Sequence, residues 1–387
     1  MYSSIKHETR LAFVLGMAIL LAACVAIKQL TALNAPQWLL IAVGLWIFVC
    51  WQLWQRLELN RAGEGAPVYP RLGWANRLTL LRGGLIAATG GFLFQPVAEG
   101  IIAWVPGLLY CIAAILDRID GFVARRSKQT SLLGSELDTV YDALGLLVAP
   151  LLAVGYGKIH WSFLLVSAAY YIFVWGLYWR RTHNLPVYPL MPSMLRRTLA
   201  GFQMGFIAFI LLPCFYAPLT IVIGIAFMLP ILVGFMVDWL VVSGRIQSST
   251  ESSTSSAAFF SGIARISHNV FQPLLRVLLL IAVVIFIVRA NGILSPEAII
   301  GLLIIIGLLI MTGAIVLGLA SRVAALILLV LIALLQGDNQ IDAIIVVMVF
   351  SCVWLMLSGA GRFSLWQWDD RWVNSRDGEE QDAEQNS

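Results

Sequence analysis

The chain has 387 residues, of which 60% are hydrophobic and only 12% are charged. About a quarter of the residues in an average soluble protein carry a charge, so this composition excludes a soluble globular protein. The formal net charge of +4 is too small to indicate a nucleic-acid partner and fits loops that face a membrane surface. We therefore expect the lipid bilayer to be the solvent over most of the chain.

The apolar runs are unbroken and about 17 to 23 residues long, without the alternation of barrel strands. Backbone groups in lipid must be satisfied within their own segment. We therefore predict an all-α integral membrane protein with about 12 transmembrane helices. The first two runs, near 11–32 and 37–54, form an N-terminal region at 1–62. The first run is too long for a signal peptide and lacks a clear cleavage site, so we expect it to be retained.

The rest of the chain divides by composition. Six further runs fall in a region at 63–246, near 78–94, 98–116, 137–156, 161–178, 199–216 and 219–242. A Ser/Thr-rich stretch at 247–262 is typical of a flexible linker. Four more runs lie in a region at 263–372, near 272–288, 298–318, 322–336 and 341–357. The acidic tail at 373–387 has a composition typical of disorder.

Basic residues concentrate in alternate loops, for example at Arg56, Arg71, Arg125 and Arg180, whereas the intervening loops carry few. The positive-inside rule then places both termini in the cytoplasm, together with the loop after the fourth run. We expect a multi-pass protein of the cell (inner) membrane. The five cysteines all lie in apolar runs without a CxxC motif, and the four histidines are scattered, so neither disulfides nor a zinc site is indicated.

Four aspartates lie close together in the sequence between 116 and 145. Asp117 and Asp120 share one helical face at the end of a run, and Asp138 and Asp142 share a face at the start of the next. The segment between them is long enough to bring the pairs together. Converging carboxylates repel one another, so they must take up protons or bind cations. Hard divalent ions such as Mg²⁺ or Mn²⁺ prefer carboxylate oxygens, and two ions can share bridging aspartates.

Small and basic residues accompany the aspartates. Gly121, Ala124 and Gly134 remove bulk beside the carboxylates, so a ligand can approach the backbone. Arg125 and Arg126 supply fixed positive charge that suits a phosphate. Metal ligands, arginine and clearance for a phosphate together indicate phosphoryl transfer.

Written out, the segment reads Asp117-x2-Asp120-Gly121-x2-Ala124-Arg125-x8-Gly134-x3-Asp138-x3-Asp142. At every fixed position it resembles the signature of the CDP-alcohol phosphotransferases (CDP-alcohol phosphatidyltransferases). The resemblance covers about residues 70–245 and implies a six-helix core. It also implies a membrane phosphatidyltransferase of phospholipid biosynthesis, which joins a phosphatidyl group from CDP-diacylglycerol to a small alcohol, releases CMP and forms a homodimer.

The same resemblance implies roles for single residues. Asp117, Asp120, Asp138 and Asp142 would hold two Mg²⁺ or Mn²⁺ ions, and Asp142 would also be the general base. The residues that would line the CDP-lipid site are Asn76, Thr79, Gly121, Ala124, Arg125, Ser131 and Gly134. Arg196 and Arg197 would hold the phosphate of the acceptor.

Several alternatives stay open. Thr139 and Ala143 stand where many relatives carry Pro and Lys, so the acceptor is glycerol 3-phosphate, an inositol phosphate, serine or another alcohol. Asn76 and Ser131 are also typical of helix starts. A different class of function, an ion-coupled transporter with an intramembrane carboxylate cation site, fits the number of runs.

The last four runs differ from the rest because they contain no group of carboxylates. The motifs "GLASRVAAL" and "LSGAGRFSLW" resemble a DoxX-type four-helix membrane domain. The linker before them indicates an independently folding module. Its role in oligomerisation, docking or regulation stays open.

Overall fold

The computed structural model describes residues 2–127, 130–190, 194–245, 267–290, 299–336, 341–359 and 361–366. These residues form helices, and they contain no β-strand. They divide into two compact units, one made of residues 2–158 and 204–213 and the other of residues 159–203 and 214–366.

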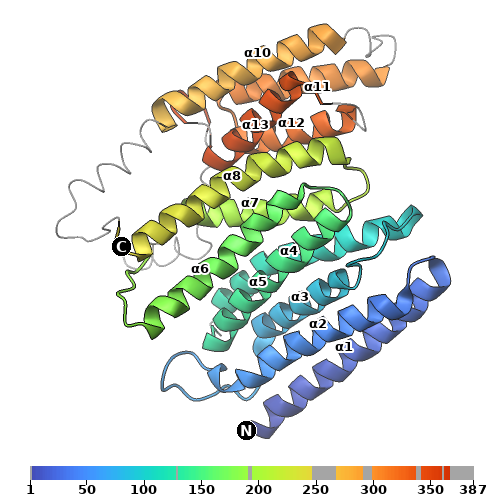
Figure 1. Cartoon of the computed structure of the whole chain (residues 1–387), viewed down its shortest axis with the longest axis vertical. Coiled ribbons are helices and arrows are strands. Elements are labelled where there is room, and N and C mark those ends of the chain that lie inside the picture. The colour runs from blue at the N-terminus through green and yellow to red at the C-terminus, as the bar shows by residue number, and fades with distance from the viewer. Residues whose placement is uncertain are drawn as a thin grey trace. The chain divides into compact units, whose positions relative to one another are not determined.

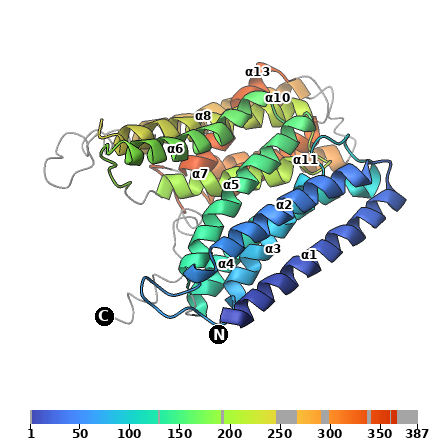
Figure 2. The same ribbon diagram turned by 60° about the horizontal axis from the view of Figure 1, so that its bottom comes forward.

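The first unit contains the aspartates. Its elements are α1 (Tyr2–Leu30), α2 (Ala35–Gln55), the 3₁₀ turn η1 (Leu57–Leu59), α3 (Gly73–Gly90), the 3₁₀ turn η2 (Gly100–Trp104), α4 (Val105–Arg126) and α5 (Leu132–Gly155). Helix α1 packs against α2, α2 against α3, and α3 against both α4 and α5 (Figures 1 and 2). Each apolar run predicted for this part overlaps one of these helices, and α3 lies at the centre of their contacts.

Glycines in α3 allow its close approach to the neighbouring helices. A Cβ atom at Gly83 would lie 2.8 Å from Val49 Cγ1 and 3.2 Å from Tyr141 Cε2. The absence of a side chain lets helix backbones come together in a membrane, where van der Waals packing drives association. Tyr141 of α5 is fully buried, and its hydroxyl donates a hydrogen bond of 2.9 Å to the backbone carbonyl of Val49 in α2. Helices α2, α3 and α5 therefore form one packed group.

The connection between α2 and α3 joins the same group through Asn60, which is fully buried. Its Nδ2 donates to the carbonyl of Arg71 at 2.8 Å, and its Oδ1 accepts a bond of 3.0 Å from Asn76 Nδ2 in α3. The backbone N–H of Leu132 donates to the carbonyl of Arg61 at 3.0 Å, at the start of α5. These hydrogen bonds hold the connection against the starts of α3 and α5.

Helix α1 contacts the start of α3 through Glu8. Its carboxylate pairs with Arg77 Nε at 2.7 Å and accepts a bond of 3.2 Å from the backbone N–H of Leu72. A carboxylate at this place satisfies a free N–H and complements the positive end of the helix dipole. The predicted boundary between 62 and 63 thus lies inside one compact unit.

The second unit contains η3 (Trp161–Phe163), α6 (Leu164–Thr182), the first part of α7 (Met194–Ile210), α8 (Ala217–Val242), the π-helical turn η4 (Ser267–Phe271), α10 (Gln272–Ala290), α11 (Ile299–Leu317), α12 (Ser321–Gln336) and α13 (Ala343–Ser358). Helix α6 packs against α8. Helices α10 to α13 contact one another in a closed order, since α10 meets α11 and α13, and α12 meets the same two (Figure 1).

Polar residues secure both ends of α13. Asp342 caps its start by accepting a bond of 3.0 Å from the N–H of Ile345. The buried Arg322 of α12 donates to the carbonyls of Met356 and Leu357 at 2.7 and 3.0 Å, which satisfies backbone groups at its end. Helices α10 to α13 belong to the same compact unit as α6 and α8, and α13 contacts α8. That these four helices are a separate DoxX-like module stays a prediction.

Length and composition support a helical membrane protein. Seven stretches of the described chain are long and apolar enough to cross a membrane: Ser4–Leu30, Ala35–Gln55, Gly100–Arg126, Leu132–Gly155, Trp161–Thr182, Ala217–Val242 and His268–Arg289. Large apolar side chains on these helices are exposed, for example Ile19 and Ile172, as expected of surfaces that face lipid. The count of about 12 spans stays a prediction, and the predicted linker at 247–262 and tail at 373–387 lie outside the described residues.

The hydrogen bond between Asn60 and Asn76 predicts energetic coupling. Asn60→Ala and Asn76→Ala should each lower the free energy of unfolding by about 2 kcal/mol, because each leaves buried partners unsatisfied. The double variant should lose less than the sum, since the shared bond is lost once. Thermal unfolding in detergent measures this. Asn60→Ala combined with Ser358→Ala in the other unit is the control and should be additive. Additivity of the Asn60 and Asn76 effects would contradict the coupling.

Candidate functional site

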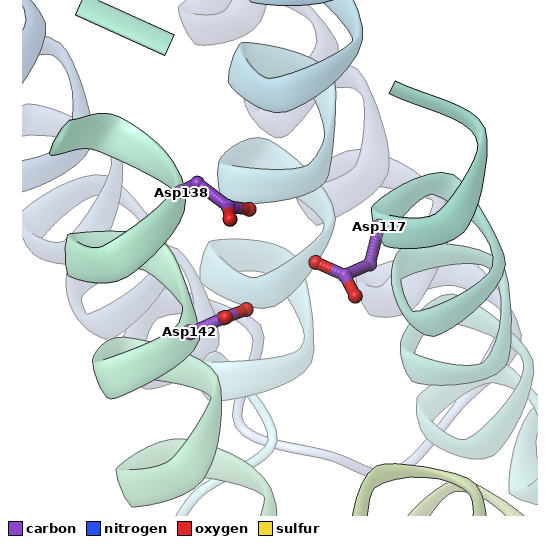
Figure 3. Close-up of side chains that lie close together, drawn as sticks. All are labelled: Asp117, Asp138 and Asp142. Carbon is purple, nitrogen blue, oxygen red and sulfur yellow. The ribbon is translucent and has the colours of Figure 1, made fainter. Parts of the chain in front are cut away.

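Three carboxylates from two helices of the first unit face one another (Figure 3). Asp117 comes from α4, and Asp138 and Asp142 come from successive turns of α5. One oxygen of each lies within 4.8 Å of one oxygen of the other two. The side chains are 25%, 47% and 44% exposed, so a ligand can reach the group.

Asp120 lies beside this group of three and outside it. Its side chain is buried, and its Oδ2 accepts a hydrogen bond of 2.8 Å from the hydroxyl of Thr79 in α3. Thr79 is itself buried. The two residues therefore form a polar contact between α3 and α4 next to the exposed carboxylates.

Arg82 of α3 joins all four aspartates, and nothing in the sequence pattern singled it out. Its side chain is 0% exposed, and its Nη1 contacts Asp117 Oδ1. The ion-pair distances are 2.8 Å from Nη1 to Asp138 Oδ1, 3.2 Å from Nη2 to Asp142 Oδ1 and 3.7 Å from Nη1 to Asp120 Oδ2. An isolated arginine within an apolar run is a signal for a partner inside the membrane, and that signal could have found it.

Asn76, Ser131 and Gly134 form a second polar group at the start of α5. Ser131 caps the helix by accepting a bond of 3.0 Å from the N–H of Gly134, and it accepts a second bond of 3.0 Å from Asn76 Nδ2. A Cβ at position 134 would lie 2.7 Å from Asn76 Oδ1, so a larger residue cannot be accommodated without a shift. Asn76 lies inside α3 and is not its cap, whereas Ser131 is a cap.

The remaining predicted residues surround the end of α4. Gly121 and Ala124 are partly buried, and Arg125 is exposed. Its guanidinium lies over Gly121, where a Cβ would be 3.3 Å from Nη1, and it makes no hydrogen bond or ion pair with the part of the chain that the structure describes. Arg196 and Arg197 fall in the first turn of α7, and their side chains lie outside the described residues.

The group of three fits a divalent ion by its chemistry. It offers only carboxylate oxygens, which Mg²⁺ and Mn²⁺ prefer. Within the described residues, the buried Oδ1 atoms of Asp138 and Asp142 have no hydrogen-bond partner, although both lie at ion-pair distance from Arg82. Such carboxylate oxygens can coordinate a cation, although the guanidinium of Arg82 lies beside them in this structure.

The chain is similar to a known protein family and to several known proteins. The family model described as CDP-alcohol phosphatidyltransferase matches residues 72–237. Proteins named CDP-diacylglycerol–glycerol-3-phosphate 3-phosphatidyltransferase are similar to parts of the chain. The one from Salmonella choleraesuis is 40% identical over 62 residues, covering 15% of this chain and 34% of the relative. The one from Cereibacter sphaeroides is 36% identical over 110 residues, covering 26% and 47%.

The chain thus spans between a third and a half of the length of these curated relatives. No solved structure matches the chain significantly. The matched residues include the whole aspartate signature together with Asn76, Thr79 and Arg82. The segment of the chain that carries the aspartates, residues 72–237, is therefore similar to the CDP-alcohol phosphatidyltransferase family.

Proposed function

We propose that the chain is a membrane phosphatidyltransferase of phospholipid biosynthesis. It would transfer a phosphatidyl group from CDP-diacylglycerol to an alcohol and release CMP. The observation that carries this proposal is the convergence of Asp117, Asp138 and Asp142 within a segment that has the family signature. Carboxylates arranged in this way suit phosphoryl transfer, in which positioning and charge neutralisation supply most of the catalysis.

The reaction makes one bond to phosphorus and breaks another. The hydroxyl oxygen of the acceptor bonds to the phosphorus that carries diacylglycerol, and the bond from that phosphorus to the oxygen of CMP breaks. CMP leaves with the electron pair, and the proton of the hydroxyl passes to the carboxylate of Asp142. Asp142 is suited to this role because it is partly exposed beside Asp117 and Asp138.

The other residues bind and orient. Asp117, Asp120, Asp138 and Asp142 would hold two divalent ions, which when bound polarise the phosphoryl oxygens and offset the charge of the leaving CMP. The guanidinium of Arg125 would bind a phosphate of the nucleotide. Asn76 and Ser131, fixed by their mutual hydrogen bonds, would border the CDP moiety together with Thr79, Gly121, Ala124 and Gly134.

The membrane setting is part of the proposal. The carboxylates lie in the C-terminal half of α4 and the N-terminal half of α5, and both helices have the length and composition of membrane spans. Such a position suits a lipid donor that stays in the bilayer and an acceptor that arrives from water. The distribution of basic residues supports a cytoplasmic site in the inner membrane, and the family resemblance supports a homodimer.

The relatives support glycerol 3-phosphate as the acceptor. Those from Salmonella choleraesuis and Cereibacter sphaeroides carry this alcohol in their names. Arg196 and Arg197, near the start of α7, provide two positive charges that could bind its phosphate.

Asp142→Asn should reduce CMP release from CDP-diacylglycerol by at least about 100-fold, because an amide cannot take the proton of the acceptor. Release is measured by chromatography with purified protein in mixed micelles containing Mn²⁺ and glycerol 3-phosphate. Asp342→Asn is the matched control, since asparagine also caps a helix, and should retain full activity. A folded Asp142→Asn protein with wild-type turnover would remove Asp142 as the base.

The acceptor is tested with radiolabelled CDP-diacylglycerol and equal concentrations of glycerol 3-phosphate, inositol 1-phosphate and serine. We expect phosphatidylglycerophosphate as the main product. Replacing both Arg196 and Arg197 with Gln should raise the KM for glycerol 3-phosphate by about tenfold or more, because charge-assisted bonds to phosphate are lost. Arg289→Gln, outside residues 72–237, should leave the KM unchanged. A main product formed from another alcohol would contradict glycerol 3-phosphate as the acceptor, but it would still support phosphatidyl transfer.

A further inference from the structure

The proposed function gives no role to Arg82, although its side chain contacts all four aspartates. Its guanidinium carries the only described positive charge in ion-pair contact with Asp117, Asp120, Asp138 and Asp142. The side chain is 0% exposed and also donates a bond of 3.1 Å to the backbone carbonyl of Asp138. Neither the aspartate signature nor any role assigned above includes this residue.

The guanidinium lies where a cation would bind. The three carboxylates close enough to share one ion are those of Asp117, Asp138 and Asp142. Arg82 bridges the same three residues, since Nη1 contacts the Oδ1 atoms of Asp117 and Asp138 and Nη2 contacts that of Asp142. A divalent ion needs carboxylate oxygens at about 2.0 to 2.6 Å. Nη1 and Nη2 of Arg82 lie between the carboxylates, where such an ion would bind. Both cations cannot use these oxygens at once.

We propose that Arg82 is an internal counter-ion, which occupies the carboxylate group when no divalent ion is bound and leaves it when one binds. The proposal rests on the divalent ion of the proposed function, and it adds a competitor for that ion. Arg82 is a positioning residue in this view: it holds the carboxylates of α4 and α5 together before the metal arrives.

Charge explains why such a residue is needed. Four carboxylates beside an apolar helix group repel one another and lose hydration. One guanidinium offsets part of this repulsion, and it cannot diffuse away because it belongs to a side chain of α3. A divalent ion carries twice its charge and packs closer to the oxygens, so it can displace the guanidinium, but only by giving up part of its binding free energy. The resident arginine therefore lowers the apparent metal affinity.

The test is a titration of full-length protein in detergent with Mn²⁺ and no substrate, in which free Mn²⁺ is followed by electron paramagnetic resonance. Arg82→Gln should bind Mn²⁺ at least about tenfold more tightly than the wild type, because the competitor is absent. Its thermal midpoint in EDTA should be lower than that of the wild type, and Mn²⁺ should raise it by a larger amount.

Two further variants make the result specific. Arg77→Gln is the matched control, because Arg77 lies in the same helix and pairs with Glu8 instead of the aspartates. It should leave the Mn²⁺ affinity unchanged. Arg82→Lys keeps the charge and should bind Mn²⁺ with an affinity within about threefold of that of the wild type. If Arg82→Gln folds only with Mn²⁺, Arg82→Lys takes its place when thermal midpoints are compared in EDTA. An affinity of Arg82→Gln equal to or weaker than that of the wild type would overturn the proposal.

The same samples separate this proposal from the proposed function. Tighter Mn²⁺ binding by Arg82→Gln, with no CMP release from CDP-diacylglycerol by the wild type, would keep the role of Arg82 and reject the transferase. Wild-type CMP release together with unchanged Mn²⁺ affinity in Arg82→Gln would keep the transferase and reject the internal counter-ion.

Discussion

The contact between Arg82 and the aspartates is the interaction on which the first unit depends. Carboxylates from α4 and α5 repel one another beside apolar helices unless they take up protons or a cation lies between them. Arg82 supplies that cation from α3, which packs against both helices. The ion pairs therefore fix the positions of α4 and α5 relative to α3, and with them the shape of the candidate site.

A second layer of polar contacts secures the ends of the same helices. Asn60 holds Asn76, Asn76 holds Ser131, and Ser131 caps α5. Asn60 belongs to the connection that follows α2, so the N-terminal region contributes directly to the order of residues around the site. Tyr141, next to Asp142 in the chain, adds a bond to α2. The N-terminal helices thus support the aspartate site within the first unit.

The two units differ in how they use buried charge. In the first, Arg82 meets carboxylates that are partly open to a ligand. In the bundle of α10 to α13, the buried Arg322 bonds to backbone carbonyls at the end of α13. The first arrangement leaves oxygens that can exchange partners, whereas the second satisfies a helix end. Because of this difference, we assign the transfer reaction to the aspartates and expect another role for α10 to α13.

The sequence by itself determined the class of protein, the runs that became helices, and the aspartate pairs on shared faces, because these follow from composition and from the 3.6-residue repeat. Tertiary structure decided that Asp120 turns to Thr79 while the other three aspartates converge. It also decided the place of Arg82, whose partners lie 35 and 56 residues away along the chain. Contacts at such separations depend on how α4 and α5 are rotated against α3, and local periodicity contains no information about that rotation.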